Sequence, residues 1–102
     1  MSRRYILSEP AAHDLDRIKS YLVEHAGVSV ARHVLREIRN ALQFLAARPG
    51  IGHLREDLTD EPVKFWPVFS YLVIYSPTSR PLEILRVLHA SRDVAAILED
   101  SP

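Results

Sequence analysis

The sequence contains no cysteine, and this absence excludes several kinds of site. Without thiols the chain forms no disulfide framework, no cysteine-ligated zinc site and no thiol nucleophile. Its five histidines, at positions 13, 25, 33, 53 and 89, lack metal-ligand spacing with Asp or Glu. There is also no phosphate-binding loop and no serine-nucleophile elbow. We therefore expect neither a metal nor a cofactor.

An excess of charge of one sign is also lacking. The 13 Lys and Arg residues balance the 13 Asp and Glu residues, so the formal net charge is zero. Proteins that grip phosphate backbones usually carry a clear excess of basic residues, because that attraction supplies most of their sequence-independent affinity. We therefore expect no direct binding of nucleic acid.

Long apolar runs are missing as well. No segment is apolar over the length needed to cross a membrane, and residues 1–10 do not have the pattern of a signal peptide. Together with the lack of cysteine, this leads us to expect a cytoplasmic protein without a membrane partner. A length of 102 residues is that of a single domain, spanning residues 1–102.

The second half of the chain is rich in strand-forming residues. Leu82–His89 is almost entirely apolar or β-branched, which predicts a central strand. Residues 68–75 predict a second strand, and the prolines and serines of residues 76–81 predict the turn of a hairpin. Residues 63–68 predict a third strand, which Pro67 restricts to the sheet edge because proline has no N–H to donate.

The first half predicts a short strand followed by a helix. Residues 3–7 form the strand, and Ser8 is the predicted N-cap of the helix. From residue 9 to about residue 26 the apolar positions recur at steps of three and four, which places them on one helical face. We expect the charged residues, Asp14 and Arg17 among them, to lie on the outer faces.

A second helix follows directly. Gly27 predicts the end of the first helix, and Ser29 is the predicted cap of a second helix over residues 30–48. The short connection predicts an antiparallel helical hairpin. Near the end of the chain, residues 94–100 predict a short helix capped by Asp93.

This order of elements predicts an α+β fold of two layers. An N-terminal strand, an antiparallel helical hairpin and a three-stranded antiparallel meander place the hairpin on one face of the sheet. The other face is expected to be partly open, and an apolar patch left there predicts a site for a protein partner.

The chain also resembles a known family, the ParE branch of the RelE/ParE superfamily. The residues that carry the resemblance span nearly the whole chain: Ser8, Ala11, Ala12, Leu15, Ile18, Tyr21, Pro49, Gly52, Arg55, Tyr71, Ile74, Tyr75 and the ending Arg86-Val87-Leu88-His89-Ala90-Ser91-Arg92-Asp93. The superfamily contains the toxins of bacterial type II toxin–antitoxin systems, which serve in plasmid stabilisation. The resemblance implies a RelE/ParE-like fold, inhibition of DNA gyrase and neutralisation by a cognate ParD-like antitoxin.

The RelE branch offers an alternative, because its members are ribosome-dependent mRNA endonucleases. Such a ribonuclease needs a base, an acid and cations on the phosphate, and the candidates are His89, Arg86 and Arg92. An odd separation along a regular strand points Arg86 and His89 to opposite faces, so we expect them not to converge. We expect His89 to bond to backbone or to Asp93, and the protein not to be an enzyme. A third hypothesis is a non-toxic remnant that only binds the antitoxin.

Binding residues are expected in three places. Arg32, Arg36 and Arg39 share one face of the second helix, which is otherwise simply a solvated face. The aromatic run of the meander predicts core and protein interface, and the strand end places ionisable groups at the sheet rim. Arg92 and Asp93 are also expected to form an ion pair. The candidates for binding antitoxin or target are Arg32, Arg36, Arg39, Trp66, Tyr71, Arg86, His89 and Arg92.

Overall fold

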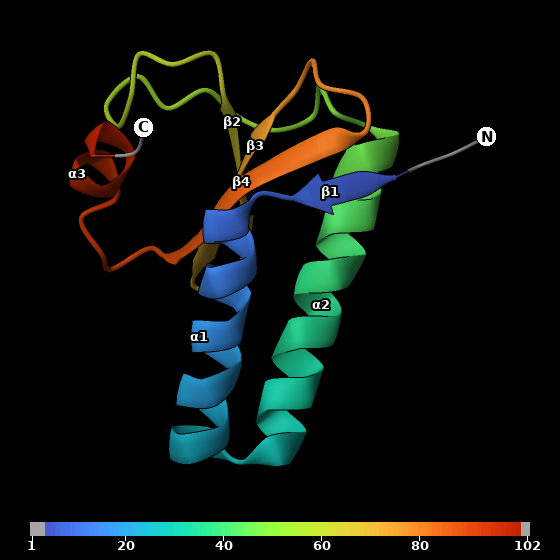
Figure 1. Ribbon diagram of the computed structural model, residues 1–102, viewed down its shortest axis with the longest axis vertical. Helices are drawn as coiled ribbons and strands as arrows, with labels where there is room; N and C mark the ends of the chain where they lie inside the picture. Colours follow the sequence, from blue (N-terminus) through green and yellow to red (C-terminus); the bar gives the residue numbers. More distant parts are fainter. Residues whose placement is uncertain (1–3, 101–102) are drawn as a thin grey trace.

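The computed structural model describes residues 4–100 as a mixed sheet with helices on both faces (Figure 1). The elements are β1 Tyr5–Leu7, α1 Glu9–Ala26, α2 Val28–Ala47, β2 Lys64–Val68, β3 Tyr71–Ser76, β4 Leu82–His89 and α3 Val94–Glu99. The sheet order is β1-β4-β3-β2, with β1 parallel to β4 and the other pairs antiparallel. The α+β fold, the central place of Leu82–His89 and the edge place of β2 are confirmed. Residue 3 of the predicted first strand lies outside the described residues.

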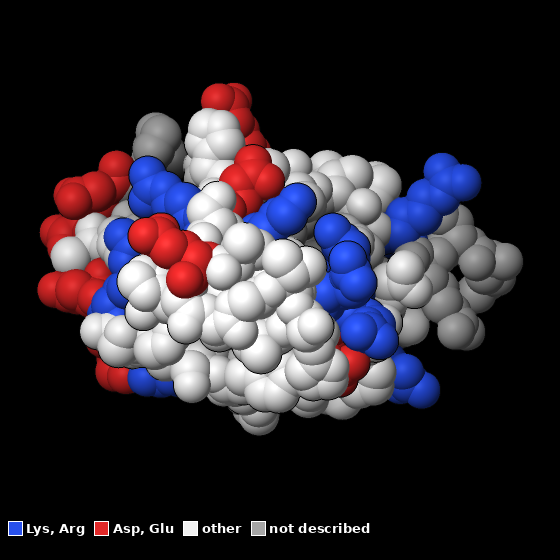
Figure 2. Space-filling view, turned by 90° about the horizontal axis from the view of Figure 1, so that it is seen from below, with Lys and Arg blue, Asp and Glu red and all other residues white. Residues whose placement is uncertain are grey.

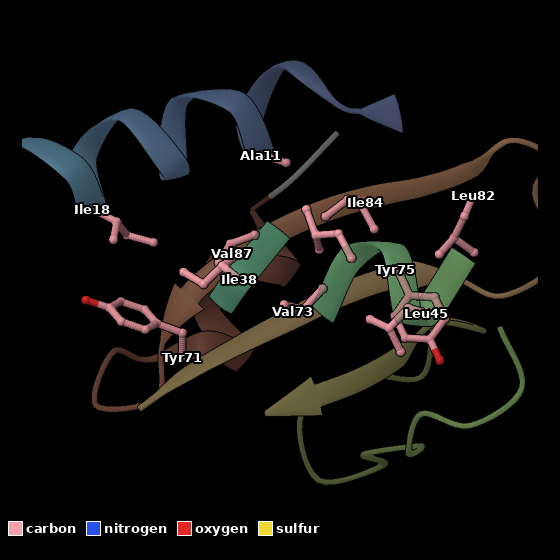
Figure 3. Packing of buried hydrophobic residues seen from close by; sticks show 11 residues of the cluster. Ala11, Ile18, Ile38, Leu45, Tyr71, Val73, Tyr75, Leu82, Ile84 and Val87 are labelled. Atoms are coloured by element: carbon pink, nitrogen blue, oxygen red, sulfur yellow. The ribbon is translucent and has the colours of Figure 1, made fainter. Parts of the chain in front are cut away.

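The helical hairpin α1–α2 packs on one face of the sheet and extends beyond it (Figure 1). The core on this face joins side chains of both helices to those of β3 and β4, as Figure 3 shows for Ile38, Val73 and Val87. Tyr71 and Ile18 lie at one end of this cluster, and Tyr75 and Leu45 lie at the other. Periodicity at three and four on the helices and at two on the strands thus builds one continuous core.

The other sheet face is not open in the way the sequence suggested. Phe65, Ile74 and Leu88 are each about 1% exposed or less, and they pack with Val94 of α3 in a second cluster. Leu58 and Val63, from the segment before β2, also pack against it. The short C-terminal helix therefore covers apolar surface that we had expected a partner to cover.

The junction of β1 with α1 completes the edge of β4. Ser8 N–H donates to the carbonyl of Ile84 at 2.9 Å, and the Ser8 hydroxyl donates to the carbonyl of Leu85 at 2.8 Å. The same hydroxyl accepts from Ala11 N–H at 3.1 Å, so the predicted N-cap is confirmed. One side chain thereby satisfies both a helix terminus and a strand that β1 is too short to cover.

The predicted cap of α2 was wrong. The helix begins at Val28 with Gly27 as N-cap, at φ 95°, and no side chain caps it. Ser29 lies inside the first turn and is exposed. The glycine adopts the left-handed backbone that links the two helices, so it serves as the end of α1 and the start of α2 at once. The helix ends at Ala47, and Arg48 is its C-cap.

The turn between β2 and β3 was missed in the sequence. Val68 ends β2 and pairs with Tyr71, which starts β3, so residues 68–75 are not one strand. Phe69 occupies the turn at φ 54°, a conformation that usually selects glycine or asparagine. Because the turn contains neither glycine nor asparagine, the sequence predicted a continuous strand through it.

Tyr75 links the sheet to the loop after α2. Its buried hydroxyl donates to the carbonyl of Pro49 at 2.8 Å and accepts from Gly52 N–H at 2.9 Å. A Cβ at position 52 would collide with the Tyr75 ring, so the close approach requires glycine. Burial raises the pKa of the Tyr75 phenol, which keeps the hydroxyl protonated as the donor that Pro49 needs.

Candidate functional site: a cleft beside helix α1

A cleft of about 530 Å³ lies between α1 and the far end of the β3–β4 hairpin. Five of its lining residues come from one face of α1, and the others come from the β2–β3 turn, from β3 and β4, and from the segment after β4. The lining residues are Asp14, Arg17, Ile18, Tyr21, Leu22, Phe69, Ser70, Tyr71, Val87, His89, Ser91 and Arg92. This volume is within the usual range for a ligand pocket, so the cleft is large enough for a few side chains of a partner.

The only acid in the cleft, Asp14, is fully engaged within the fold. Its carboxylate accepts from Arg86 Nε at 2.7 Å, from Arg86 Nη2 at 2.9 Å and from the N–H of Val87 at 3.0 Å. Asp14 is 4% exposed, although the sequence had placed it on an outer face of α1. The carboxylate takes the position that a longer β1 would occupy beside β4, and its hydrogen bonds raise the pKa of Arg86.

Arg86 and His89 do not converge, as predicted. Arg86 is paired with Asp14, and its side chain keeps 17% exposure on another hollow, beside Ser8 and Leu98. His89 faces the cleft, with its ring edge-on to Tyr71 at 5.3 Å. Two of the three ribonuclease candidates therefore open onto different surfaces, whereas the third, Arg92, lines the cleft together with His89.

The hydrogen bonds of His89 determine which ring nitrogen carries its proton. Ser91 N–H donates to Nδ1 at 3.1 Å, and the Ser91 hydroxyl lies 2.7 Å from the same atom. Nδ1 is therefore an acceptor, and in the neutral ring the proton lies on Nε2. The predicted bond of His89 to backbone is confirmed, with the Ser91 N–H as its donor. The predicted alternative was a bond to Asp93, whose side chain instead accepts from Ala96 N–H. In this tautomer Nε2 is a donor rather than a base.

Tyr71 forms the floor of the cleft. Its side chain is almost buried, and burial, with a smaller effect of the nearby Tyr21, raises the pKa of its phenol. The hydroxyl therefore stays protonated at neutral pH and is unsuited to act as a base. As the sequence suggested, the aromatic run is largely core, but Phe69 is 60% exposed at the cleft mouth.

Two arginines supply the charge of the cleft. Arg17 of α1 and Arg92 after β4 are exposed, and neither has an ion pair among residues 4–100. The expected pair of Arg92 with Asp93 is absent there, because Asp93 instead accepts from Ala96 N–H at 3.2 Å as the N-cap of α3. The cleft therefore combines unpaired positive charge with an apolar wall.

The sequence analysis missed Arg17, Tyr21 and Phe69 as cleft residues. A signal for two of them was present, because positions 14, 17, 18, 21 and 22 lie on one helical face by their spacing. The signal for Phe69 was absent, since its place depends on the unrecognised turn.

The three arginines of α2 lie elsewhere. Arg32, Arg36 and Arg39 are all exposed, and none of them joins an ion pair in the described part of the chain. Viewed from the end of the helical hairpin, basic side chains gather on the side where α2 lies, beside a broad uncharged area (Figure 2). The exposed large apolar residues of α1 and α2 near the connection between the two helices are Tyr21, Val23, Val28 and Val30.

Trp66 belongs to neither surface. Its ring packs 5.6 Å from Phe44 of α2 and stacks 5.9 Å from His53, at the end of α2 away from the cleft. The ring is partly buried and joins the core of the helical face. The eight residues proposed for binding are therefore distributed over the cleft, the α2 face, an internal ion pair and this aromatic contact.

Metal and membrane features are absent from the described residues. Across residues 4–100, no three His, Asp or Glu side chains are grouped to hold a metal ion. None of the helices in that range has the length and apolar character that crossing a bilayer requires.

Residues 5–94 match the family model described as the ParE toxin of the type II toxin–antitoxin system parDE. The chain belongs to the ParE toxin family. It is 33% identical over 95 residues to Toxin ParE1 of Mycobacterium tuberculosis, covering 92% of this chain and 96% of that protein. It is 35% identical over 94 residues to Toxin ParE1 of Caulobacter vibrioides, with 92% and 96% covered. Toxin ParE3 of the same organism is 33% identical over 95 residues, with 93% and 94% covered.

A solved structure shares the fold of this toxin. The chromosomal ParDE system from P. aeruginosa contains a chain that matches with a TM-score of 0.69 at 21% identity, covering 86% of the toxin and 98% of that chain. As a toxin of a type II system, the protein is paired with an antitoxin. The family also agrees with the expectation that the protein is not an enzyme.

Proposed function

We propose that this toxin acts by binding and inhibiting DNA gyrase and that a ParD-like antitoxin holds it inactive. Membership of the ParE family supports this target over the ribosome. Since gyrase works in the cytoplasm, the proposal places the toxin there.

The observation that carries the proposal is the arrangement and protonation of the residues that a ribonuclease would use. Arg86, the cation nearest the strand centre, is held by Asp14 and opens away from His89. His89 presents Nε2–H, and burial keeps the Tyr71 phenol protonated, so neither group is a ready base. Cleavage of RNA without a metal needs a base, an acid and cations in one place. The cleft brings the cations Arg17 and Arg92 together with His89 and Tyr71, so the group of this set that it lacks is the base. A mechanism through protein contact needs none of these.

We propose further that the α2 face with Arg32, Arg36 and Arg39 contacts the target. The three guanidinium groups are exposed on one helical face and have no ion pair within the described residues. A flat row of cations suits a large acidic protein surface, which it attracts over a distance and orients.

A supercoiling assay with purified gyrase tests both statements. We expect the wild-type toxin to inhibit supercoiling, and the triple variant Arg32→Glu/Arg36→Glu/Arg39→Glu to lose at least tenfold in potency. Lys19→Glu is the control for reversal of a single exposed charge away from the α2 face, because Lys19 lies on α1 outside the cleft. Absence of inhibition by wild type at several-fold molar excess would count against gyrase as the target.

The alternatives have their own readouts. Codon-aligned cuts in an in vitro translation with primer extension, lost in His89→Ala, would establish the ribonuclease hypothesis instead. Induction in a host without any growth defect would favour the non-toxic remnant.

A further inference from the structure

Helix α1 and the segment after β4 bring two unpaired cations into one cleft. Arg17 and Arg92 both line it and are exposed, and neither has an ion pair among residues 4–100. A guanidinium group binds phosphate through two parallel N–H bonds, so a pair of them suits one phosphate group. His89 lines the same cleft and adds its Nε2–H as a further donor. The cleft therefore offers a set of donors suited to a small, doubly charged anion.

The single carboxylate that lines the cleft does not compete for these donors. The side chain of Asp14 is 3% exposed and accepts two hydrogen bonds from Arg86 and one from the N–H of Val87. The Asp14–Arg86 pair is neutral as a unit, so its effect on an anion in the cleft is small beside that of two unpaired guanidinium groups. The charge that the cleft presents to a ligand is therefore positive.

Exposed aromatic rings line the same cleft. Tyr21 is 59% exposed and Phe69 is 60% exposed, so the contact of the Phe69 ring with His33, at 5.9 Å between ring centres, leaves much of that ring accessible. Phe69 keeps this position at φ 54°, a left-handed conformation that is unfavourable for a bulky residue. Backbone strain of this kind is concentrated at ligand and active sites. An exposed ring is also a surface on which any nucleobase can stack.

The size and charge of the cleft suit one nucleotide better than a strand. A volume of about 530 Å³ is that of a small-molecule pocket. A strand of RNA or DNA needs a series of cations along its phosphates, and the whole chain has no excess of basic residues. None of the groups that line the cleft is poised as a base, because Nδ1 of His89 is engaged by Ser91 and the Tyr71 phenol stays protonated. A phosphate ester held there is therefore bound without being cleaved.

We propose that the cleft is a binding site for a nucleoside 5′-monophosphate. The phosphate lies between Arg17 and Arg92, and the base packs against the exposed rings of Tyr21 and Phe69. Binding of the nucleotide depends neither on gyrase as the target nor on the antitoxin.

Isothermal titration calorimetry of the purified toxin with AMP, GMP, CMP and UMP tests the site. We expect at least one of them to bind with a dissociation constant of about 10–100 µM, which is the range that the usual binding efficiency of a ligand of about 23 non-hydrogen atoms gives. The corresponding nucleoside and inorganic phosphate each supply half of the ligand, and each should bind at least about tenfold more weakly.

Variants separate the cleft from the net charge of the protein. Arg17→Gln/Arg92→Gln removes both cations of the cleft and should weaken nucleotide binding at least about tenfold. Arg36→Gln/Arg39→Gln is the matched control, because it removes two other exposed arginines that have no ion pair within residues 4–100 and lie outside the cleft. This control should change the dissociation constant by less than about twofold.

A further variant covers the case in which the double substitution fails to fold. Tyr21→Ala removes an exposed ring without changing charge, and it should weaken nucleotide binding at least about fivefold, as loss of a stacking partner does. The fluorescence of the single tryptophan, Trp66, during urea unfolding checks that each variant is folded.

Three results would overturn the site, and none of them involves gyrase. The first is the absence of binding by all four monophosphates at millimolar concentration. The second is an equal loss in the two arginine pairs, or a nucleoside that binds as tightly as its monophosphate, since the phosphate would then not be held by Arg17 and Arg92. The third is a single-stranded RNA oligonucleotide that binds more than about tenfold more tightly than any monophosphate and loses this binding in Arg17→Gln/Arg92→Gln, which would make the ligand a strand.

Discussion

The pair of Asp14 and Arg86 offers the sharpest stability test, because its two partners differ in exposure. Asp14→Asn keeps the shape of the side chain but removes the charge that holds Arg86, whose side chain is 17% exposed and retains some contact with water. Arg86→Met leaves the Asp14 carboxylate, 3% exposed, with only the N–H of Val87 as donor. Removing one partner of a buried ion pair costs about 3–5 kcal/mol. We therefore expect Asp14→Asn to lie near the lower value and Arg86→Met near the upper one.

These losses are a large part of the whole stability, since domains of this kind unfold with about 5–15 kcal/mol. Urea unfolding followed by the fluorescence of Trp66 measures them, and the slope with denaturant should stay constant because the same surface is exposed. The double variant Asp14→Asn/Arg86→Met should lose about 2 kcal/mol less than the sum of the single losses, since neither charge is left alone.

Two results would refute this reasoning. One is a loss below about 1 kcal/mol for both single variants, which would mean that the pair is solvated as a surface salt bridge is. The other is additive single losses in the double variant, which would mean that the residues act independently. In either case Arg86 would be free for a functional role, and the ribonuclease hypothesis would regain one of its two cations.

Three other contacts give expectations for the same assay. Ser8→Ala removes a helix cap and the bond to Leu85, and should cost about 1–2 kcal/mol, whereas Ser29→Ala on α2 should change stability by less than about 0.5 kcal/mol; equal losses would contradict the cap assignment. Tyr75→Phe leaves two backbone groups without partners and should cost about 1–3 kcal/mol. Because burial raises the pKa of Tyr75, its contribution is complete below the unfolded value of about 10 and is lost as pH rises from there through the folded value, so above about pH 10 wild type should lose stability more steeply than Tyr75→Phe. Phe69→Gly relieves a left-handed backbone and should raise stability by about 0.5–1 kcal/mol; a loss would show that the ring contributes more than the strain costs.

The elements that were predicted correctly depend on local patterns. Leu82–His89 was identified by composition, the α1 boundaries by Ser8 and Gly27, and α3 by its cap Asp93. In each case the deciding residues lie within one turn or one strand of the feature they mark. The errors arose where the deciding partner was distant or where an unusual residue filled a position. Phe69 occupies a turn position where glycine is usual, and Gly27 is the N-cap of α2, the role predicted for Ser29.

The packing of α3 on the second sheet face also depends on residues that are distant in the sequence. Residues 94–100 were predicted as a short helix, but nothing local to them indicates which surface the helix meets. Only the sheet topology brings Val94 over Ile74 and Leu88. The sequence therefore correctly indicated an apolar surface on this face of the sheet. The prediction that a partner covers that surface was wrong, because α3 covers it.

The internal ion pair was within reach of the sequence, although neither residue reveals it alone. An arginine inside a strand of buried residues requires a partner, since isolated buried charge is very costly. An aspartate three residues after Ala11 and four before Ile18 lies on the apolar face of its helix, and it has the same requirement. In a two-layer fold, one buried acid and one buried base are expected to pair with each other, although here 72 positions separate them in the sequence. Had they been paired in this way, Arg86 would have left the list of catalytic candidates, and Arg17 and Arg92 would have remained as the charges available to a partner.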